Sequence, residues 1–343
     1  MTDSLSVEQD CPRHRRPGRR RTQGTGDLID GKIDVHAHYL PEPYRVRLAQ
    51  AGHTQPDGMP AIPAWSAAGH VALMDRLGIA TSLLSVSTPG VHLAGGASAA
   101  DVARDVNEAG RRAVVDHPGR FGLFGSLPLP DVDAALAEIA HCCDHLDVDG
   151  FVLLTNVDGT YLGDPAWEPV WAELDRRRAR VLVHPTSPVC WEHTSLGRPR
   201  PMLEFLFDTT RAIVDLVLNG TIARHPDVRL IVPHAGATLP VIADRVALFS
   251  LALGVDPSVD VLRDLAGLHF DLSGTPLPRQ LNALRELTSP DHLHFGSDYP
   301  FTPDFVAEIA TGQLDAAGDP PGSLATSLRA NTLALFPRLA AGR

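Results

Sequence analysis

The sequence predicts an α/β fold and, within that class, a (β/α)8 TIM barrel. Short apolar runs alternate with longer helical stretches eight times along the chain. The 343 residues suffice for eight strand–helix units and their loops. Several strand runs also end in His or Asp, at the end where barrels gather their functional groups. An open, doubly wound sheet is the alternative, but no GxGxxG motif follows the first strand, so a dinucleotide site is not supported.

Eight strands are expected because each run is short, apolar and bounded by turn residues. They are Ile33–His38, Ala80–Val86, Phe121–Leu127, Gly150–Thr155, Arg180–His184, Arg229–His234, Leu268–Leu272 and His292–Ser297. Parallel neighbours in a sheet need a long crossover connection, so a helix is expected after each strand.

Eight helices are expected, seven between these strands and one after the last, with starts such as Asp131 and Pro165 that favour a first helical turn. They are Ala67–Leu77, Ala99–Asp116, Val132–His145, Pro165–Arg178, Thr209–Arg224, Leu239–Leu253, Leu277–Leu287 and Gly322–Leu335. Two long loops stand out, Tyr39–Ser66 after strand one and Thr186–Phe207 after strand five. Loops after barrel strands lie on the face that carries chemistry.

The charge balance excludes some classes of function. The chain has 30 basic and 41 acidic residues, a net charge of -11, and its single lysine is Lys32. Such a composition is a poor candidate for general nucleic-acid binding or for lysine-based covalent catalysis. The 16 histidines leave metal or acid–base chemistry open.

The first 27 residues differ from the rest. The run Cys11–Thr22 holds six arginines and few apolar residues, which predicts a disordered basic tail before a catalytic domain at 28–343. A nucleic-acid or membrane-surface arm is the alternative, but nothing aromatic or amphipathic accompanies the charge. The four cysteines form no CxxC pair, and no apolar run has the length of a membrane span. We therefore expect a cytoplasmic protein without membrane or nucleic-acid partners.

The sharpest motif is Asp34-Val-His36-Ala-His38 on the first predicted strand. Side chains alternate along a strand, so His36 and His38 are expected on one side, where two imidazoles can share a metal ion. A His-x-His pair alone is moderate evidence in a chain with 16 histidines.

Three further strand ends strengthen this interpretation. Strand five ends in His184 and strand six in His234, and Asp298 directly follows the last strand. The carboxyl ends of all barrel strands converge on one face, so these groups should meet the His-x-His pair. Histidines with one carboxylate suit Zn²⁺ or another divalent transition metal. Each histidine taken alone would be interpreted as a core residue or a strand-end cap.

Together these motifs resemble the amidohydrolase superfamily over nearly the whole chain after residue 30. The similarity is greatest to its decarboxylase branch, which includes aminocarboxymuconate semialdehyde, γ-resorcylate and 6-methylsalicylate decarboxylases. It rests on Tyr161–Trp171, Val183–Thr186, Pro233–Gly236 and Phe295–Pro300. The first of these segments, together with Phe207–Arg211, looks especially like 6-methylsalicylate decarboxylases.

The resemblance implies roles for individual residues. It makes His36, His38, His184 and Asp298 metal ligands, with His234 and Asp298 acting in catalysis. It also implies that Arg245 reaches a substrate carboxylate across a homodimer interface, although an ordinary surface arginine is the alternative. A second substrate arginine of the family has no match between Gln50 and Leu73, where Trp65 stands instead. This departure suits a substrate with a single carboxylate.

The resemblance also bears on the number of metal ions. Many binuclear amidohydrolases bridge two metals through a carboxylated lysine at the end of strand four, but that strand ends Leu153-Leu-Thr-Asn156 here. Lys32 precedes strand one, so we expect one divalent ion per subunit. A His-x-His pair favours Zn²⁺, whereas relatives that decarboxylate phenolic acids often use Mn²⁺.

The expected activity is non-oxidative decarboxylation of a hydroxybenzoate-type acid resembling 6-methylsalicylate, with Asp298 or His234 supplying a proton to the ring carbon. Hydrolysis of a lactone, amide or ester by metal-activated water uses the same kind of site and is the alternative. A metal-binding or assembly protein without activity is a third class, which the intact ligand set disfavours.

Overall fold

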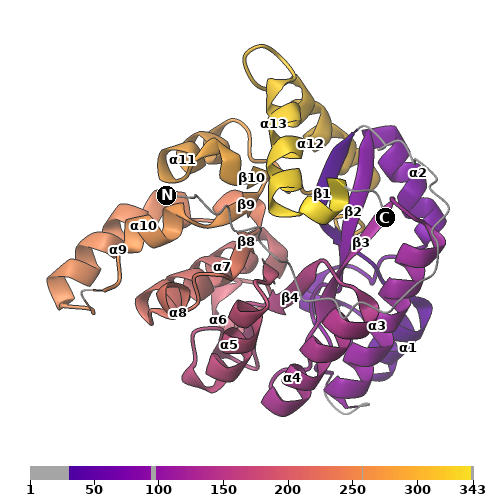
Figure 1. The fold of residues 1–343 in the computed structure, drawn as a ribbon, viewed down its shortest axis with the longest axis horizontal. Helices are drawn as coiled ribbons and strands as arrows, with labels where there is room; N and C mark the ends of the chain where they lie inside the picture. The colour runs from indigo at the N-terminus through magenta and orange to yellow at the C-terminus, as the bar shows by residue number, and fades with distance from the viewer. Residues whose placement is uncertain (1–30, 94–97, 257, 341–343) are drawn as a thin grey trace, which may run out of the picture.

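The computed structural model describes residues 31–93, 98–256 and 258–340, drawn as a ribbon in Figure 1. Eight strands form one parallel sheet in the order β1-β2-β3-β4-β7-β8-β9-β10. They are β1 (Lys32–His38), β2 (Ile79–Ser85), β3 (Phe121–Ser126), β4 (Gly150–Leu154), β7 (Arg180–His184), β8 (Arg229–Val232), β9 (His269–Asp271) and β10 (Leu293–His294). Backbone bridges Asp34–Phe295 and Ala37–Tyr299 join the last strand region to the first. The predicted (β/α)8 barrel is confirmed.

Apolar side chains from six strands fill the interior of the barrel. They are Ile33, Val35, Leu83, Phe124, Val152, Leu182 and Ile231. Residues of α13 (Ser323–Leu335) and α14 (Pro337–Ala340) belong to the same cluster. Burying a side chain of this size stabilises the folded state by about 1.5–3 kcal/mol, so this layer fixes the strands whose far ends carry the site.

Helices cover the outside of the barrel, as Figure 1 shows. They include α2 (Ala67–Leu77), α3 (Ala99–Asp116), α4 (Val132–His141), α5 (Glu168–Arg176), α7 (Arg200–Leu218), α9 (Leu239–Leu253), α11 (Arg279–Leu287) and α12 (Asp304–Ala316). Ser66, Ser98 and Asp131 cap three of them by accepting a hydrogen bond from the backbone N–H three residues later. A second, larger apolar cluster packs these helices against the strands.

Two predicted helices have ends that differ most from those in the structure. The α-helical part of the third predicted helix ends at His141 and continues as a π turn over Cys142–Leu146. The helix predicted at Thr209–Arg224 begins at Arg200 and ends before Gly220, whose φ of 69° breaks it from α8 (Thr221–Arg224). The long loop predicted after strand five is correspondingly shorter.

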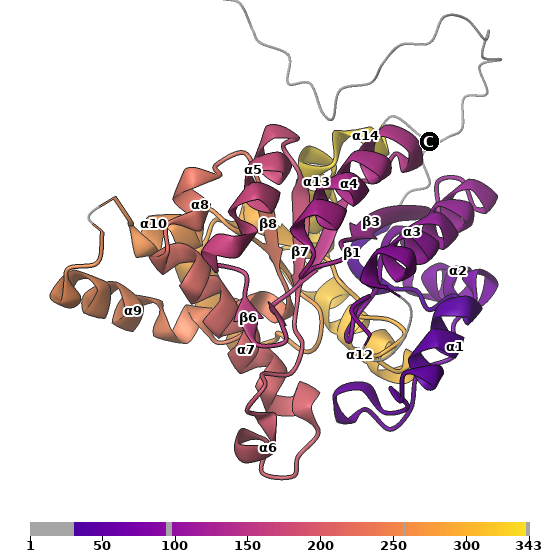
Figure 2. The same cartoon turned by 90° about the horizontal axis from the view of Figure 1, so that it is seen from below.

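The loops at the carboxyl ends of the strands carry structure that the sequence pattern did not reveal. The loop after β1 contains α1 (Glu42–Gln50), and the loop after β7 contains α6 (Trp191–Thr194). Figure 2 shows both at the lower end of the barrel, opposite α14. After β4, a short hairpin of β5 (Asn156–Val157) and β6 (Thr160–Tyr161) turns through Asp158 and Gly159, both with positive φ.

The predicted tail at residues 1–27 lies outside the described residues. Among the helices that the structure describes, none combines the length and apolarity needed to cross a membrane. Cys142 and Cys190 are free thiols.

Candidate metal centre

A β-bulge near the end of β1 sets the direction of its two histidines. Asp34 pairs with Ser82, but Ala37 pairs with Leu84, so β1 carries one extra residue in this interval. Val35 lies in the apolar interior, and strict alternation would turn the side chain of His36 away from it. Because of the bulge, His36 joins the interior layer above Val35.

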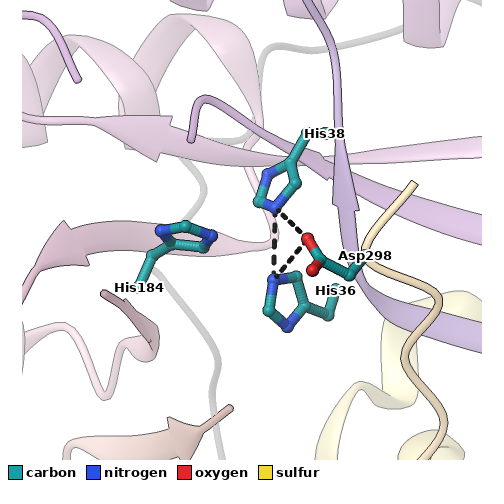
Figure 3. A group of neighbouring side chains, drawn as sticks. All are labelled: His36, His38, His184 and Asp298. Carbon is teal, nitrogen blue, oxygen red and sulfur yellow. Dashed lines mark hydrogen bonds and ion pairs between the residues drawn. The ribbon is translucent and has the colours of Figure 1, made fainter. Parts of the chain in front are cut away.

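Four side chains from β1, β7 and the segment after β10 meet above the apolar interior, as Figure 3 shows. The Nε2 atoms of His36 and His38 are 3.2 Å apart, and Asp298 Oδ1 lies 3.4 Å and 3.1 Å from them. His184 completes a group whose ligand atoms all lie within 4.8 Å of one another. Two nitrogens bound to one tetrahedral zinc at about 2.0–2.1 Å are about 3.3 Å apart, so this spacing fits a shared ion.

Hydrogen bonds fix which nitrogen each histidine presents. His36 Nδ1 lies 2.8 Å from Asp271 Oδ2, and His184 Nδ1 lies 2.8 Å from the Pro185 carbonyl. His38 Nδ1 lies 2.9 Å from Ser85 Oγ, which itself donates to the Ala37 carbonyl and so acts as an acceptor for the ring. In each ring Nδ1 has a hydrogen-bond partner, which leaves Nε2 as the atom that can bind a cation once it carries no proton.

Burial and charge act in opposite directions at this centre. Burial lowers the pKa of His38 and holds the pKa of His184 well below its usual value. Burial also acts to lower the pKa of His36, but the carboxylates of Asp271 and Asp298 outweigh it and raise that pKa to about 9. Burial would raise the pKa of Asp298, yet its histidine neighbours hold it well below the ordinary range. The result is an ionised carboxylate among imidazoles, a donor set suited to a divalent cation.

Asp298 and His234 both occupy left-handed backbone conformations, with φ of 57° and 54°. Such backbone strain in residues other than glycine is concentrated at active sites and ligand-binding sites. The Asp298 amide donates to the His36 carbonyl at 2.7 Å, which fixes its loop against β1. His234 Nε2 lies 3.6 Å from Asp298 Oδ2, and His234 Nδ1 has no hydrogen-bond partner in the part of the chain that the structure describes.

Two buried aspartates that the sequence patterns did not mark as functional hold this arrangement. Asp271 accepts from His36 Nδ1 with one oxygen and from the His234 amide at 3.1 Å with the other. Asp34 accepts from the amide and hydroxyl of Ser297, beside Asp298. Burial raises the pKa of Asp34 to about 7, against the hydrogen bonds from Ser297. The available signal was position, because Asp271 ends the seventh strand as His184 ends the fifth.

The two predicted substrate residues lie apart from this group. Arg245 is exposed on α9 with its guanidinium 4.7 Å from the centre of the Phe249 ring. Trp65 Nε1 donates to His70 Nδ1 at 3.0 Å, and its ring lies 6.0 Å from that of Tyr39. Neither side chain contacts the four clustered residues within the described chain, so their roles in substrate binding stay predictions.

Lys32 lies far from these ligands in the structure. Its Nζ forms an ion pair with Asp315 of α12 at 2.9 Å. Lys32 is the first residue of β1 and His38 the last, so the two lie at opposite ends of the strand. Lys32 therefore cannot bridge two metals at this site.

The fold and the site define a barrel protein with three histidines and one aspartate clustered at the carboxyl ends of its strands. The chain belongs to the amidohydrolase family, whose sequence pattern matches residues 33–338. It is 35% identical over 322 residues to a 6-methylsalicylic acid decarboxylase of Aspergillus aculeatus, covering 90% of this chain and 96% of that protein. The resemblance inferred from the motifs is confirmed.

Solved structures agree with this family assignment. A crystal structure of an amidohydrolase II superimposes with a TM-score of 0.84 and 32% identity, covering 89% of this chain and 99% of the other. A dihydroxybenzoic acid decarboxylase of Polaromonas, crystallised with manganese and 2-nitroresorcinol, superimposes with a TM-score of 0.75 and 21% identity, covering 90% and 97%. The second likeness concerns the fold alone.

Proposed function

We propose that this protein is a metal-dependent, non-oxidative decarboxylase of a hydroxybenzoate-type acid similar to 6-methylsalicylate. The observation that carries the proposal is the cluster of three histidines and one aspartate, in a chain 35% identical to a 6-methylsalicylic acid decarboxylase. The reaction is a carboxy-lyase step in which a ring carbon gains a proton and loses CO2.

His36, His38, His184 and Asp298 would hold one divalent ion. When bound, such an ion supplies Lewis-acid charge for the substrate carboxylate and its neighbouring phenolate. Zn²⁺ is our first choice because imidazole-rich tetrahedral sites favour it, and Mn²⁺ is the second. Elemental analysis of protein purified without added metal distinguishes the two.

Asp298 and His234 would transfer the proton to the ring carbon. The ring carbon that bears the carboxylate accepts a proton from Asp298, the C–C bond to the carboxylate breaks, and its electron pair returns to the ring as CO2 leaves. Asp298 is held ionised by its histidine neighbours, which keep its pKa low, so it needs a proton source before each turnover. His234 Nε2, 3.6 Å from Asp298 Oδ2, is placed to pass that proton.

Substrate turnover tests the proposal against hydrolysis. Metal-loaded protein is incubated with 6-methylsalicylate and with 2,6-dihydroxybenzoate, and CO2 and the phenolic product are measured. We expect CO2 and the phenolic product in equal amounts from each acid that is consumed. Release of no CO2 from either acid, together with ring opening of an aryl lactone, would instead establish the hydrolase.

We further propose that the protein is a homodimer that buries the apolar face of α9. Val241, Leu248, Leu251 and Leu253 of this helix are 63–82% exposed, an unusual apolar content for a solvent-facing helix. Arg245 lies on the same helix, so its predicted contact with the partner's substrate depends on this interface. Light scattering of wild type and of Leu248→Glu tests it, with a dimer expected for the first and a monomer for the second. A monomeric wild type would contradict it.

A further inference from the structure

A cavity of about 350 Å³ lies at the carboxyl ends of β2, β3, β4 and β7, the same end of the barrel as the metal centre. Thr186 lines it two residues after His184, and Val86 lines it between Ser85 and Ser87. Ser85 contacts His38 Nδ1, and Ser87 Oγ lies 3.3 Å from His184 Nε2. Lining residues of the cavity therefore neighbour, along the chain, residues that contact His38 and His184.

The lining of this cavity is mainly apolar. Val86, Leu127, Leu154, Val157, Val189 and Trp191 contribute much of it. The hairpin tip closes one side, where Gly159 packs so closely on Val189 that an added Cβ would lie 2.7 Å from it. Such a wall favours hydrocarbon groups over charged ones.

The charges around the cavity disfavour a second anion. Its ionisable lining residues are His53, His92, Asp57 and Asp158, and no arginine or lysine lines it among the described residues. Asp158 contacts His92 at 3.1 Å, and Asp57 accepts from the Ser187 amide at 3.2 Å.

A neighbouring guanidinium already has partners of its own. Arg200 stacks 4.0 Å from the centre of the Trp191 ring and lies 3.8 Å from Asp57 Oδ1. A second carboxylate in the cavity would therefore lose its hydration without gaining a partner.

The volume exceeds what a methylated ring needs. An apolar cavity of about 150 Å³ holds a benzene ring, and a group of methyl size takes roughly the ~30 Å³ of a water molecule. A cavity of about 350 Å³ thus has room for the ring and several further carbon atoms.

We infer that this cavity is a specificity pocket for salicylate-type monocarboxylic acids whose ring carries an unbranched alkyl chain longer than methyl. This inference rests on the proposed decarboxylase function. The carboxylate and phenolate face the metal centre, and the alkyl chain lies along Leu154, Val157 and Val189. A ring substituent that carries its own carboxylate is excluded.

A substrate series tests the inference. kcat/KM is measured for 6-methyl-, 6-propyl- and 6-butylsalicylate and for 4-hydroxyisophthalate, which carries a second carboxylate. We expect kcat/KM to rise about fourfold per added carbon, as buried methylenes do, and to be at least ~100-fold lower for the dicarboxylate. A steady fall from methyl to butyl would overturn the inference while leaving the decarboxylase function intact. Absence of CO2 from every acid would overturn the function itself.

Two variants, each with a matched control, locate the effect. Val157→Phe should lower kcat/KM for 6-butylsalicylate at least ~30-fold and change that for the methyl compound less than ~3-fold. Val189→Arg, at a position 68% exposed, should raise kcat/KM for 4-hydroxyisophthalate at least ~10-fold. The same two substitutions at Val115, which is 58% exposed on α3, are the controls and should change neither kcat/KM value. Equal losses for both alkyl substrates in Val157→Phe, with unchanged melting temperature, would place the alkyl chain elsewhere.

Discussion

Histidines form two groups in the described barrel, and only one of the two groups is built to bind a cation. At the carboxyl ends of the strands, His36, His38 and His184 share a carboxylate. In the second group, His269 begins β9 and its Nδ1 lies 3.0 Å from Nε2 of His294, the last residue of β10. The His292 ring lies 4.6 Å from that of His269. The three rings of the metal centre are buried, whereas in the second group His294 is buried and His269 and His292 are half-buried. Both groups contain three neighbouring rings, so proximity alone does not distinguish them.

The partners of the rings distinguish the two groups. The rings of the metal centre have Nδ1 partners and face Asp271 and Asp298. In the other group, His294 uses Nε2 for His269 and Nδ1 for Thr332, so no lone pair of His294 is left for a metal. Charge differs as well, because burial, His292 and Arg229 lower the pKa of His269 to about 3. A histidine becomes a ligand where a hydrogen bond occupies one nitrogen and a carboxylate faces the other.

The strongest test makes the same substitution, His to Ala, once in each group. His38→Ala should lose the metal and all decarboxylase activity above background, because one of four ligands is removed. His294→Ala should keep one metal per chain and most of the activity but lower the free energy of unfolding by several kcal/mol, since it leaves a cavity and an unpaired His269. Elemental analysis, CO2 release and denaturant unfolding measure the three quantities. Loss of metal in His294→Ala would contradict the distinction.

Asp298→Asn tests whether the carboxylate does more than bind the ion. The amide keeps the shape and an oxygen ligand but cannot carry the proton, so kcat should fall by about 10²–10⁴-fold with the metal still bound. Metal content and single-turnover CO2 release are measured together. Wild-type turnover by the metal-loaded variant would remove Asp298 from the proton path.

The metal centre was largely predictable from sequence because it depends on period and position. Strand ends of a parallel barrel converge, so His184, His234 and Asp298 could be brought to the His-x-His pair without coordinates. The bulge on β1 and the left-handed φ of His234 were not predictable, because both result from tertiary contacts with Phe295, Tyr299 and Asp271.

The loops were the least predictable part of the chain. Helix α1 lies in the proline-rich loop after β1, and the early start of α7 includes Pro201, so proline content indicated loop where a helix begins. The polar side chains that fix these loops act over long sequence distances. Asp57, for example, accepts from Thr88 and Ser187, and no local pattern encodes such a contact.

Asp271→Asn measures how much the carboxylate that is hydrogen-bonded to His36 contributes to metal affinity. The amide can accept from His36 Nδ1 but no longer supplies the charge that favours the ligand geometry, so metal affinity should fall by about 10–100-fold. Competition with a chelator gives the affinity. Asp315→Asn, which removes the Lys32 partner at the opposite end of β1, is the control and should leave metal affinity unchanged.

The second histidine group should reveal itself by acid sensitivity. The pKa values of His269 and His294 are lowered from 6.5 to about 3, chiefly by burial, so the unfolded chain binds protons that the folded chain does not. Their stabilisation is complete above pH 6.5 and is lost as the pH falls toward 3. The test uses metal-free protein, and the variant and wild type share all their other histidines. His294→Gln should lose less unfolding free energy between about pH 7 and pH 4.5 than wild type. Equal losses in urea titrations would show that His294 does not set the acid sensitivity, which would then lie with other histidines such as His70, whose pKa burial also lowers to about 3.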